Sequence, residues 1–264
     1  MCLILFAAGM HPDYPLIVAA NRDEFHARPT ASSHVWQVPD GILAGRDLQA
    51  GGTWLGVNRR GQFAAITNIS ERVQDGDWLS RGDLVKQFLC GANAAVDFAA
   101  SIAGERYRGF NLLLRDGDAL VHASNRSDTG VLAAGIHGIA NADLGEDRFK
   151  VRRGTEGMAA VLESTRDDDA LVKALFALLT NRTPPPMPER HAAGLSASEE
   201  QALGACFIVG RDYGTRASTV VLIGEHGARV IERIHGPMGA DAGCSEHSLP
   251  FHAVNRHTES YARS

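Results

Sequence analysis

The stretch MCLILFAAGMHPDYPLIVAANRDEF, residues 1–25, decides the fold. It contains two short apolar runs, Leu3–Ala8 and Leu16–Ala20, separated by a segment with glycine, proline and aspartate. Apolar runs of this length on either side of turn-forming residues are typical of a β-hairpin. The sequence therefore predicts two antiparallel strands joined by a turn centred near Pro12.

The register of this hairpin brings a charged residue close to Cys2. A turn near Pro12 pairs Ala8 with Leu16, and the same register carried outward sets Cys2 opposite Arg22. Directly opposed residues have Cβ atoms about 4.5–5.5 Å apart, so these two side chains would lie within contact range. A slip of one residue would remove the arrangement.

Cys2 is a candidate nucleophile. If Met1 is removed, residue 2 carries a thiol and a free α-amine, whose reference pKa of about 7.7–8.0 suits it to take the thiol proton. Arg22 would favour the thiolate, and the carboxylate of Asp23 could hold or orient the amine. The alternatives are a small buried hydrophobe for Cys2 and a solvated charged turn for Arg22, Asp23 and Glu24.

The rest of the chain predicts an α+β protein. Further strands are expected at Trp54–Asn58, Gln62–Asn68, Phe110–Arg115, Ala119–Ser124, Cys206–Gly210, Thr219–Gly224 and Ala228–Ile234. Helices are expected at Ser80–Cys90, where Ser80 and Asp83 resemble a capping box, and at Asn93–Ala103, Arg148–Glu163 and Asp167–Thr180. Strands and helices follow one another in groups, which indicates layers rather than regular βαβ alternation.

Composition and charge exclude several classes of function. The chain has 264 residues and a formal net charge of −5, so nucleic acid is not expected as the main partner. No stretch approaches the roughly 20 apolar residues that span a bilayer. The four cysteines are scattered without a CxxC pair, which favours a reducing compartment over a disulfide framework. We therefore expect a soluble, cytoplasmic protein.

Histidines near the end of the chain do not predict a metal site. His247, His252 and His257 are five residues apart, with Cys244 nearby. Ligands on one helix face are spaced by three or four residues, so structural or exposed roles are expected and no metal.

Two segments are expected to be irregular. Residues 182–204 contain a proline run and a polar, alanine-rich stretch, which is typical of a flexible connection. The tail at residues 236–264 shows no clear pattern either. Too little chain follows either segment to form another unit, so we expect one domain over residues 1–264.

The string ANRDEF at Ala20–Phe25, with Met1-Cys2 before it and Arg28-Pro29 after it, resembles the NRDE family, which includes the transport and Golgi organisation protein 2 of animals. The resemblance covers residues 1 to about 235. It continues in order through GGTWLG (51–56), TN (67–68), RG (81–82), GFNL (109–112), ANA (140–142) and YGTR (213–216).

This family is similar in turn to the N-terminal-nucleophile hydrolases, in particular the choloylglycine hydrolase and penicillin acylase branch. The resemblance implies a four-layer αββα sandwich, in which two stacked antiparallel sheets carry a helix pair on each outer face. The helices within residues 80–103 would form one pair and those within residues 148–180 the other.

The resemblance also implies roles for individual residues. Cys2 matches the nucleophile, and Arg22 and Asp23 match a charged pair on the second strand. The backbone N–H of Asn68 and the side-chain amide of Asn141 resemble the donors that hold an oxyanion, which acyl transfer requires. Arg216 is similar to a late arginine that closes the active site. The candidates for substrate binding are Asn21, Glu24 and Trp54.

The residues themselves leave other roles open. Asn68 could simply end a strand, and Asn141 could fix a turn. Arg216 falls in an expected hairpin turn, where a surface arginine is ordinary. Trp54 follows the glycine pair 51–52, which would form a tight turn, so Trp54 could instead be a core residue.

Two functions follow. In the first, the protein hydrolyses a linear amide or related acyl bond of a small molecule through Cys2. In the second, the same pocket carries haem or an acyl lipid without cleaving it, because the resemblance links the family to haem trafficking and lipid homeostasis. Arg22 and Arg216 could then bind the haem propionates. No cofactor is expected, and haem would be a ligand only.

Overall fold

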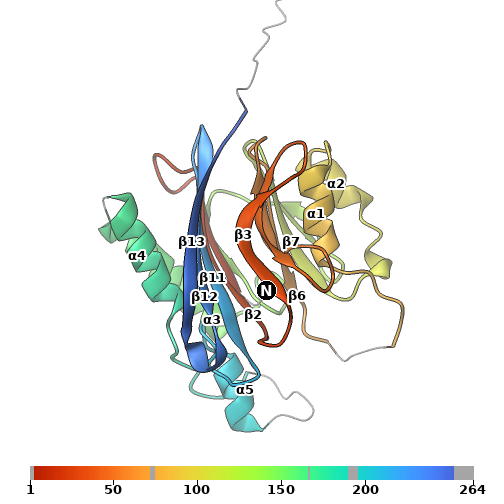
Figure 1. Ribbon diagram of the computed structural model, residues 1–264. Coiled ribbons are helices and arrows are strands. Elements are labelled where there is room, and N and C mark those ends of the chain that lie inside the picture. The colour runs from red at the N-terminus through yellow and green to blue at the C-terminus, as the bar shows by residue number, and fades with distance from the viewer. Residues whose placement is uncertain (1–2, 72–74, 166, 190–195, 253–264) are drawn as a thin grey trace, which may run out of the picture.

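The protein folds into two antiparallel sheets with helices on both outer faces (Figure 1). The structure is a computed structural model that describes residues 3–71, 75–165, 167–189 and 196–252. The strands of the first sheet are β1 (Leu3–Ala8), β2 (Leu16–Phe25), β10 (Gly135–Ile139), β11 (Tyr213–Ile223), β12 (Gly227–His235) and β13 (Asp241–Pro250). Their order is β10-β1-β2-β11-β12-β13, so β2 is an inner strand.

The second sheet contains the middle of the chain and keeps sequence order throughout. Its strands are β3 (Thr30–Trp36), β4 (Ile42–Asp47), β5 (Leu55–Asn58), β6 (Phe63–Asn68), β7 (Phe110–Asp116), β8 (Ala119–Ser124) and β9 (Gly130–Val131). Each strand is antiparallel to its neighbours. Most of the connections are short, whereas the one from β6 to β7 contains α1 and α2.

The helices cover the two outer faces in the predicted pairs. They are α1 (Gly82–Cys90), α2 (Ala95–Ser101), α3 (Phe149–Ser164), α4 (Asp168–Leu179) and α5 (Ala197–Leu203), with short 3₁₀ turns η1 (Gly104–Arg106) and η2 (Pro237–Gly239). Helices α1 and α2 pack on the second sheet, and α3 and α4 pack on the first (Figure 1). The αββα sandwich expected from the sequence is confirmed.

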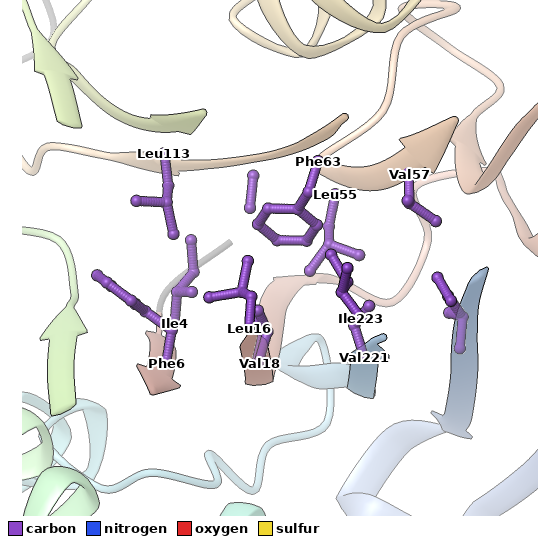
Figure 2. Close-up of a cluster of buried hydrophobic side chains, with 14 of the residues drawn as sticks. Ile4, Phe6, Leu16, Val18, Leu55, Val57, Phe63, Leu113, Val221 and Ile223 are labelled. Carbon is purple, nitrogen blue, oxygen red and sulfur yellow. The ribbon is translucent and has the colours of Figure 1, made fainter. Parts of the chain in front are cut away.

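Side-chain alternation along β1 and β2 divides the core into layers. Ile4, Phe6 and Val18 point between the sheets, where they meet Phe63 of the opposite sheet (Figure 2). The odd-numbered positions, such as Leu5, point outward to α3 and α4. Because successive residues of a strand face opposite sides, this parity also decides where each polar residue of β2 points.

The predicted hairpin register is confirmed wherever the structure describes both strands. Ala8 pairs with Leu16, and the ladder runs without a slip to Leu3 opposite Asn21. Cys2 lies outside the described residues.

The expected strand at Cys206–Gly210 is wrong. The amide of Asn21 donates to the carbonyl of Cys206 at 2.7 Å, and the N–H of Phe207 donates to the carbonyl of Asn181 at 2.9 Å. These bonds hold the segment against the end of α4 instead of in a ladder. The last meander begins later, at Tyr213, so Arg216 lies within β11 and not in a turn.

Part of the tail that was expected to be irregular is strand β13. It pairs along β12, and most of its side chains are exposed. An exposed edge strand buries little apolar surface, so it has no hydrophobic alternation to reveal it. Residues 253–264 of the tail lie outside the described residues.

The connection at 182–204 contains one helix that the sequence pattern did not predict. Helix α5 begins after Ser196, whose side chain accepts from the N–H of Glu199 in a capping box. Residues 190–195 lie outside the described residues. The capping box expected at Ser80 is absent from the described structure: α1 begins after Arg81 and has no side-chain cap.

Within the described ranges, no helix is long and apolar enough to cross a membrane.

Candidate active site

A cleft of about 460 Å³ lies where the end of β2 meets the second sheet. We call it the arginine cleft, after four of its residues: Arg22, Arg28, Arg81 and Arg108. Its other lining residues include Glu24, Asp47, Trp54, Ile66, Asn68, Asp77, Trp78 and Ser80. Four of the sequence-predicted site residues, Arg22, Glu24, Trp54 and Asn68, therefore share one cavity of a size suited to a small-molecule ligand.

Strand parity places Arg22 in this cleft. It is an even-numbered residue of β2, so it faces the second sheet like Val18 and is only 4% exposed. Its guanidinium stacks over the Trp54 ring at 4.3 Å from the centroid. Burial of a cation is costly, and that burial lowers the pKa of Arg22.

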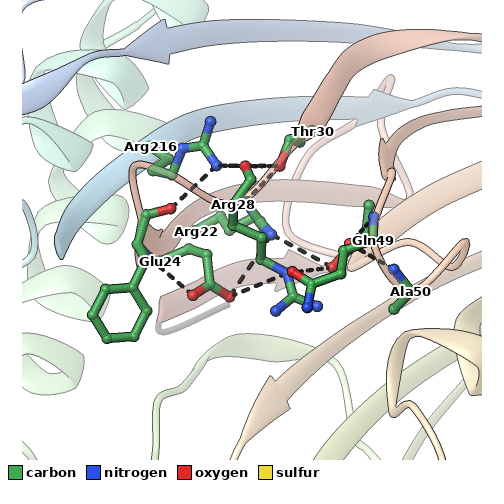
Figure 3. A network of polar contacts seen from close by, with 9 residues as sticks. Arg22, Glu24, Arg28, Thr30, Gln49, Ala50 and Arg216 are labelled. Atoms are coloured by element: carbon green, nitrogen blue, oxygen red, sulfur yellow. Dashed lines mark hydrogen bonds and ion pairs between the residues drawn. The ribbon is translucent and has the colours of Figure 1, made fainter. Parts of the chain in front are cut away.

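The charged partners of Arg22 lie at a distance. Its Nη2 is 3.8 Å from the carboxylates of both Glu24 and Asp47, and its Nη1 is 3.4 Å from Thr30 Oγ1 (Figure 3). Strong charge-assisted bonds are near 2.7–2.9 Å. Among the described residues, then, this buried guanidinium has long contacts and keeps donor capacity for a ligand.

Asp47 is fixed by other groups. Arg28 Nε donates to it at 2.7 Å, and the N–H groups of Gln49 and Ala50 donate to its other oxygen at 3.0 Å (Figure 3). Burial opposes ionisation, but these hydrogen bonds outweigh it and lower the pKa of Asp47. The carboxylate therefore stays ionised beside Arg22.

Arg216 lies beside the cleft rather than in its wall. It is the extra residue of a β-bulge, since Thr215 pairs with Asp23 whereas Ala217 pairs with Arg22. Its Nη1 donates to the carbonyl of Arg28 and to Thr30 Oγ1 (Figure 3). Arg216 thus braces the loop that carries Arg28, and its charge adds to that of the cleft.

Asn21 and Asp23 face away from the arginine cleft. As odd-numbered residues of β2 they point to the helix side, and both are buried. Asn21 donates to the carbonyls of Leu179 and Cys206 and accepts from Ser218 Oγ at 2.7 Å. With these bonds, the side chain that was predicted to bind substrate connects β2 to α4 and β11.

Asp23 is held in the same buried layer. Thr215 Oγ1 donates to Asp23 Oδ1 at 2.6 Å, and Thr215 also accepts from the N–H of Ile208 at 2.9 Å. The structure therefore separates Arg22 and Asp23 onto the two faces of β2, although the sequence analysis grouped them beside Cys2.

Asn68 and Asn141 are in contact, but only Asn68 lines the arginine cleft. Asn68 lines the cleft, and its carbonyl accepts from Asn141 Nδ2 at 2.8 Å. The carbonyl of Asn141 in turn accepts from the N–H of Ser70 at 3.0 Å. The Asn141 side chain thereby contacts the backbone of a residue that lines the cleft.

A buried polar network fixes the backbone around Asn141. Thr67 Oγ1 donates to the carbonyl of Ala140 at 2.8 Å, and Asn111 Nδ2 donates to that of Ala142 at 2.8 Å. Asn111 Oδ1 is 3.0 Å from His122 Nε2, whose burial lowers the pKa of the imidazole and favours its neutral form. The motifs at 67–68, 109–112 and 140–142 therefore meet in one place.

The motifs at 51–56 and 81–82 meet for a steric reason. A Cβ added at Gly52 would lie 2.6 Å from the backbone of Gly82, and Thr53 N–H donates to the carbonyl of Gly82 at 3.2 Å. Only residues without side chains allow this approach, which brings Trp54 and Arg81 to the same cleft.

Sequence reasoning missed Thr30, Asp47 and Arg108, and gave Arg28 and Arg81 no role. Arg28 and Arg81 belong to motifs of the family resemblance, Arg28-Pro29 and RG (81–82), and this membership could have marked them as site residues. Asp47 and Arg108 carry no local signal, because only the packing of the two sheets brings them to Arg22.

The chain matches the family described as Transport and Golgi organisation 2 over residues 1–236. A Bos taurus relative, named Transport and Golgi organization protein 2 homolog, is 34% identical over 248 residues, covering 86% of this chain and 90% of the relative. The Homo sapiens protein of the same name is 32% identical over the same shares.

Two solved structures share the fold. One is a Caenorhabditis elegans ortholog of N-acylethanolamine-hydrolyzing acid amidase, with TM-score 0.52, 10% identity, and coverage of 84% of this chain and 93% of that one. The other is the C2A mutant of a conjugated bile acid hydrolase from Clostridium perfringens, with TM-score 0.51, 7% identity, and coverage of 94% and 92%. The predicted likeness to N-terminal-nucleophile hydrolases is thus confirmed for the fold, and the sequence match establishes that the chain belongs to the Transport and Golgi organisation 2 family.

Proposed function

We propose that the protein hydrolyses a linear amide or related acyl bond of a small molecule, with Cys2 as its nucleophile. One observation carries the proposal: β1 and β2 pair in register up to Leu3 opposite Asn21, and Arg22 of β2 faces the arginine cleft. The same ladder, continued by one residue, predicts Cys2 opposite Arg22. The parity that turns Ile4 between the sheets predicts the same for the Cys2 side chain.

The two proteins of similar fold support the reaction class. One is named as an amidase and the other as a hydrolase, and the second was solved as a C2A mutant. We propose the same class of reaction for this chain: cleavage of an amide, with the cysteine at position 2 as the nucleophile.

The reaction balances with groups that this chain would supply. With Met1 removed, the α-amine of Cys2 takes the thiol proton, and the thiolate attacks the carbonyl carbon. The carbonyl electron pair moves to the oxygen, which accepts hydrogen bonds from the N–H of Asn68 and from the Asn141 Nδ2 hydrogen that the carbonyl of Asn68 does not use. The C–N bond then breaks as the α-ammonium protonates the leaving amine. Water attacks the resulting thioester, and this step releases the acid and restores the thiol.

Arg22 is assigned an electrostatic role in this scheme. Its guanidinium is buried against Trp54, and its ion pairs with Glu24 and Asp47 are 3.8 Å long, so its N–H groups are not held by short bonds to either carboxylate. A cation in a region of low dielectric stabilises a nearby thiolate more than it would in water.

Alkylation kinetics test this role. The rate of iodoacetamide labelling at Cys2, mapped by peptide mass spectrometry, should reach half its maximum well below pH 8.5, the ordinary value for a free cysteine. Arg22→Gln should move that midpoint upward, whereas Arg126→Gln, which removes an arginine paired with Glu71 outside the cleft, should not. A midpoint near 8.5 in the wild type would remove the electrostatic argument.

A second candidate is a carrier of haem or an acyl lipid. The observation that favours it is that several guanidinium groups line one cleft together with Trp54 and Ile66, which suits a ligand with both acidic and apolar parts. Haem titration would then give a Soret band that Arg22→Ala weakens and Cys2→Ala leaves unchanged. Absence of a Soret shift in the wild type would dismiss haem.

A further inference from the structure

Arg108 is a cation of the arginine cleft whose guanidinium has no hydrogen-bond or ion-pair partner among the described residues. It lines the cleft, and its Nε atom is buried yet makes no hydrogen bond. Its guanidinium forms no ion pair within the part of the chain that the structure describes, and only its backbone carbonyl is used, by Asn125. Nearly all buried polar groups in folded proteins are hydrogen-bonded, so such an atom calls for an explanation.

The carboxylate of Glu71, whose pKa Arg108 influences, already has other hydrogen-bond partners. Glu71 accepts from the N–H of Gly109 at 2.7 Å and pairs with Arg126 at 2.9 Å. Burial opposes ionisation of Glu71, but these bonds and the nearby charge of Arg108 lower its pKa. Glu71 is therefore a counter-charge that Arg108 influences, and among the described residues it is not a hydrogen-bond partner of the Arg108 guanidinium.

The cleft as a whole carries an excess of positive charge. Four arginines and three carboxylates line it, and the bond between Arg28 and Asp47 cancels one charge of each sign. A second carboxylate, Asp77, is exposed, where solvent screens its charge. Arg216 adds a further positive charge at the edge through its bond to Thr30. A cavity with this balance attracts anions and repels cations.

We propose that the cleft selects ligands that carry an anionic group, and that Arg108 is the residue that selects the charge. This inference rests on the proposed function, for which it names the substrate class: acyl amides with a carboxylate, sulfonate or phosphate near the scissile bond. Arg22 then acts at the reacting end of the cleft and Arg108 at the anionic end. A guanidinium offers such a group two parallel N–H donors, which suits Arg108 to bind it.

Matched pairs of amides test the charge preference. N-decanoylglycine and N-decanoylglycinamide differ in one negative charge on the amine side, whereas a dicarboxylic acid monoamide and its methyl ester differ on the acyl side. Binding is measured by calorimetry on Cys2→Ala, which holds ligand without turnover, and kcat/KM is measured on the wild type. Raising the salt concentration should weaken only the anionic members.

We expect the anionic member of at least one pair to bind about 10- to 100-fold more tightly than its neutral partner, the range of a charge-assisted hydrogen bond. Arg108→Gln, combined with Cys2→Ala, should remove this preference while leaving the neutral member unchanged, and Arg108→Lys should restore part of it. Arg106→Gln is the matched control, because Arg106 is exposed nearby and does not line the cleft.

The two proposals fail separately. Equal binding of the charged and neutral members of both pairs overturns the anionic subsite even if the wild type hydrolyses them. Selective binding that Arg108→Gln abolishes, without turnover of any amide, supports the subsite and overturns the hydrolase. A preference that persists in folded Arg108→Gln and Arg108→Lys would assign the selection to other residues and contradict the role of Arg108.

Discussion

Cys2→Ala is expected to abolish turnover of acyl amides while leaving ligand binding largely intact. The substitution removes the attacking sulfur but leaves Arg22 and Trp54, which form the cleft wall, in place. Cys2→Ser should lower kcat by at least about 1,000-fold, because the hydroxyl is far harder to ionise than the thiol. Initial rates with a panel of amides, together with calorimetric binding of the same amides, measure both effects.

Two other cysteines provide the controls for this result. Cys90 and Cys244 are exposed and free, so Cys90→Ala and Cys244→Ala remove accessible thiols without touching the cleft. Both variants should keep wild-type turnover. Undiminished activity in Cys2→Ala would exclude it as the nucleophile, and loss of haem binding on that substitution alone would identify Cys2 as a thiolate ligand instead.

Phe63→Ala should destabilise the protein by about 3–5 kcal/mol, the cost of removing a buried aromatic side chain. Phe63 is fully buried between the two sheets and points from β6 toward the opposite sheet (Figure 2). The sheets are close-packed there, so the vacated space can collapse only in part. Urea denaturation followed by circular dichroism gives the free energy of unfolding.

Phe25→Ala is the matched control for the core prediction. Phe25 is 59% exposed and contacts Tyr213 edge to face, so its loss should cost at most about 1 kcal/mol. Equal losses for Phe63→Ala and Phe25→Ala would contradict the assignment of the inter-sheet core.

The hairpin and its register could be predicted from the sequence because they are local. Two apolar runs and one turn fix the pairing of Ala8 with Leu16, and nothing distant changes it. The αββα layers came from the family resemblance, since the expected strands and helices do not by themselves set how sheets stack. Strand β13 was missed because a polar edge strand shows no alternation.

The candidate site was predicted only in part. Strand parity alone separates Arg22 and Glu24 from Asn21 and Asp23, so the sequence contained the signal that Asn21 and Asp23 face the helices. The position of Arg108 in the cleft could not be predicted from strand parity. It follows a 3₁₀ turn far along the chain, and only the packed sheets bring it to the cleft that Arg22 lines.

Intact mass spectrometry after incubation with an activated acyl ester tests the central claim most directly. We predict a chain that lacks Met1 and carries one acyl group, mapped to the peptide that begins with Cys2 and missing from Cys2→Ala. A chain that retains Met1, or an acyl group found on Cys90 or Cys244 while Cys2 stays unmodified, would contradict the assignment of Cys2 as the nucleophile.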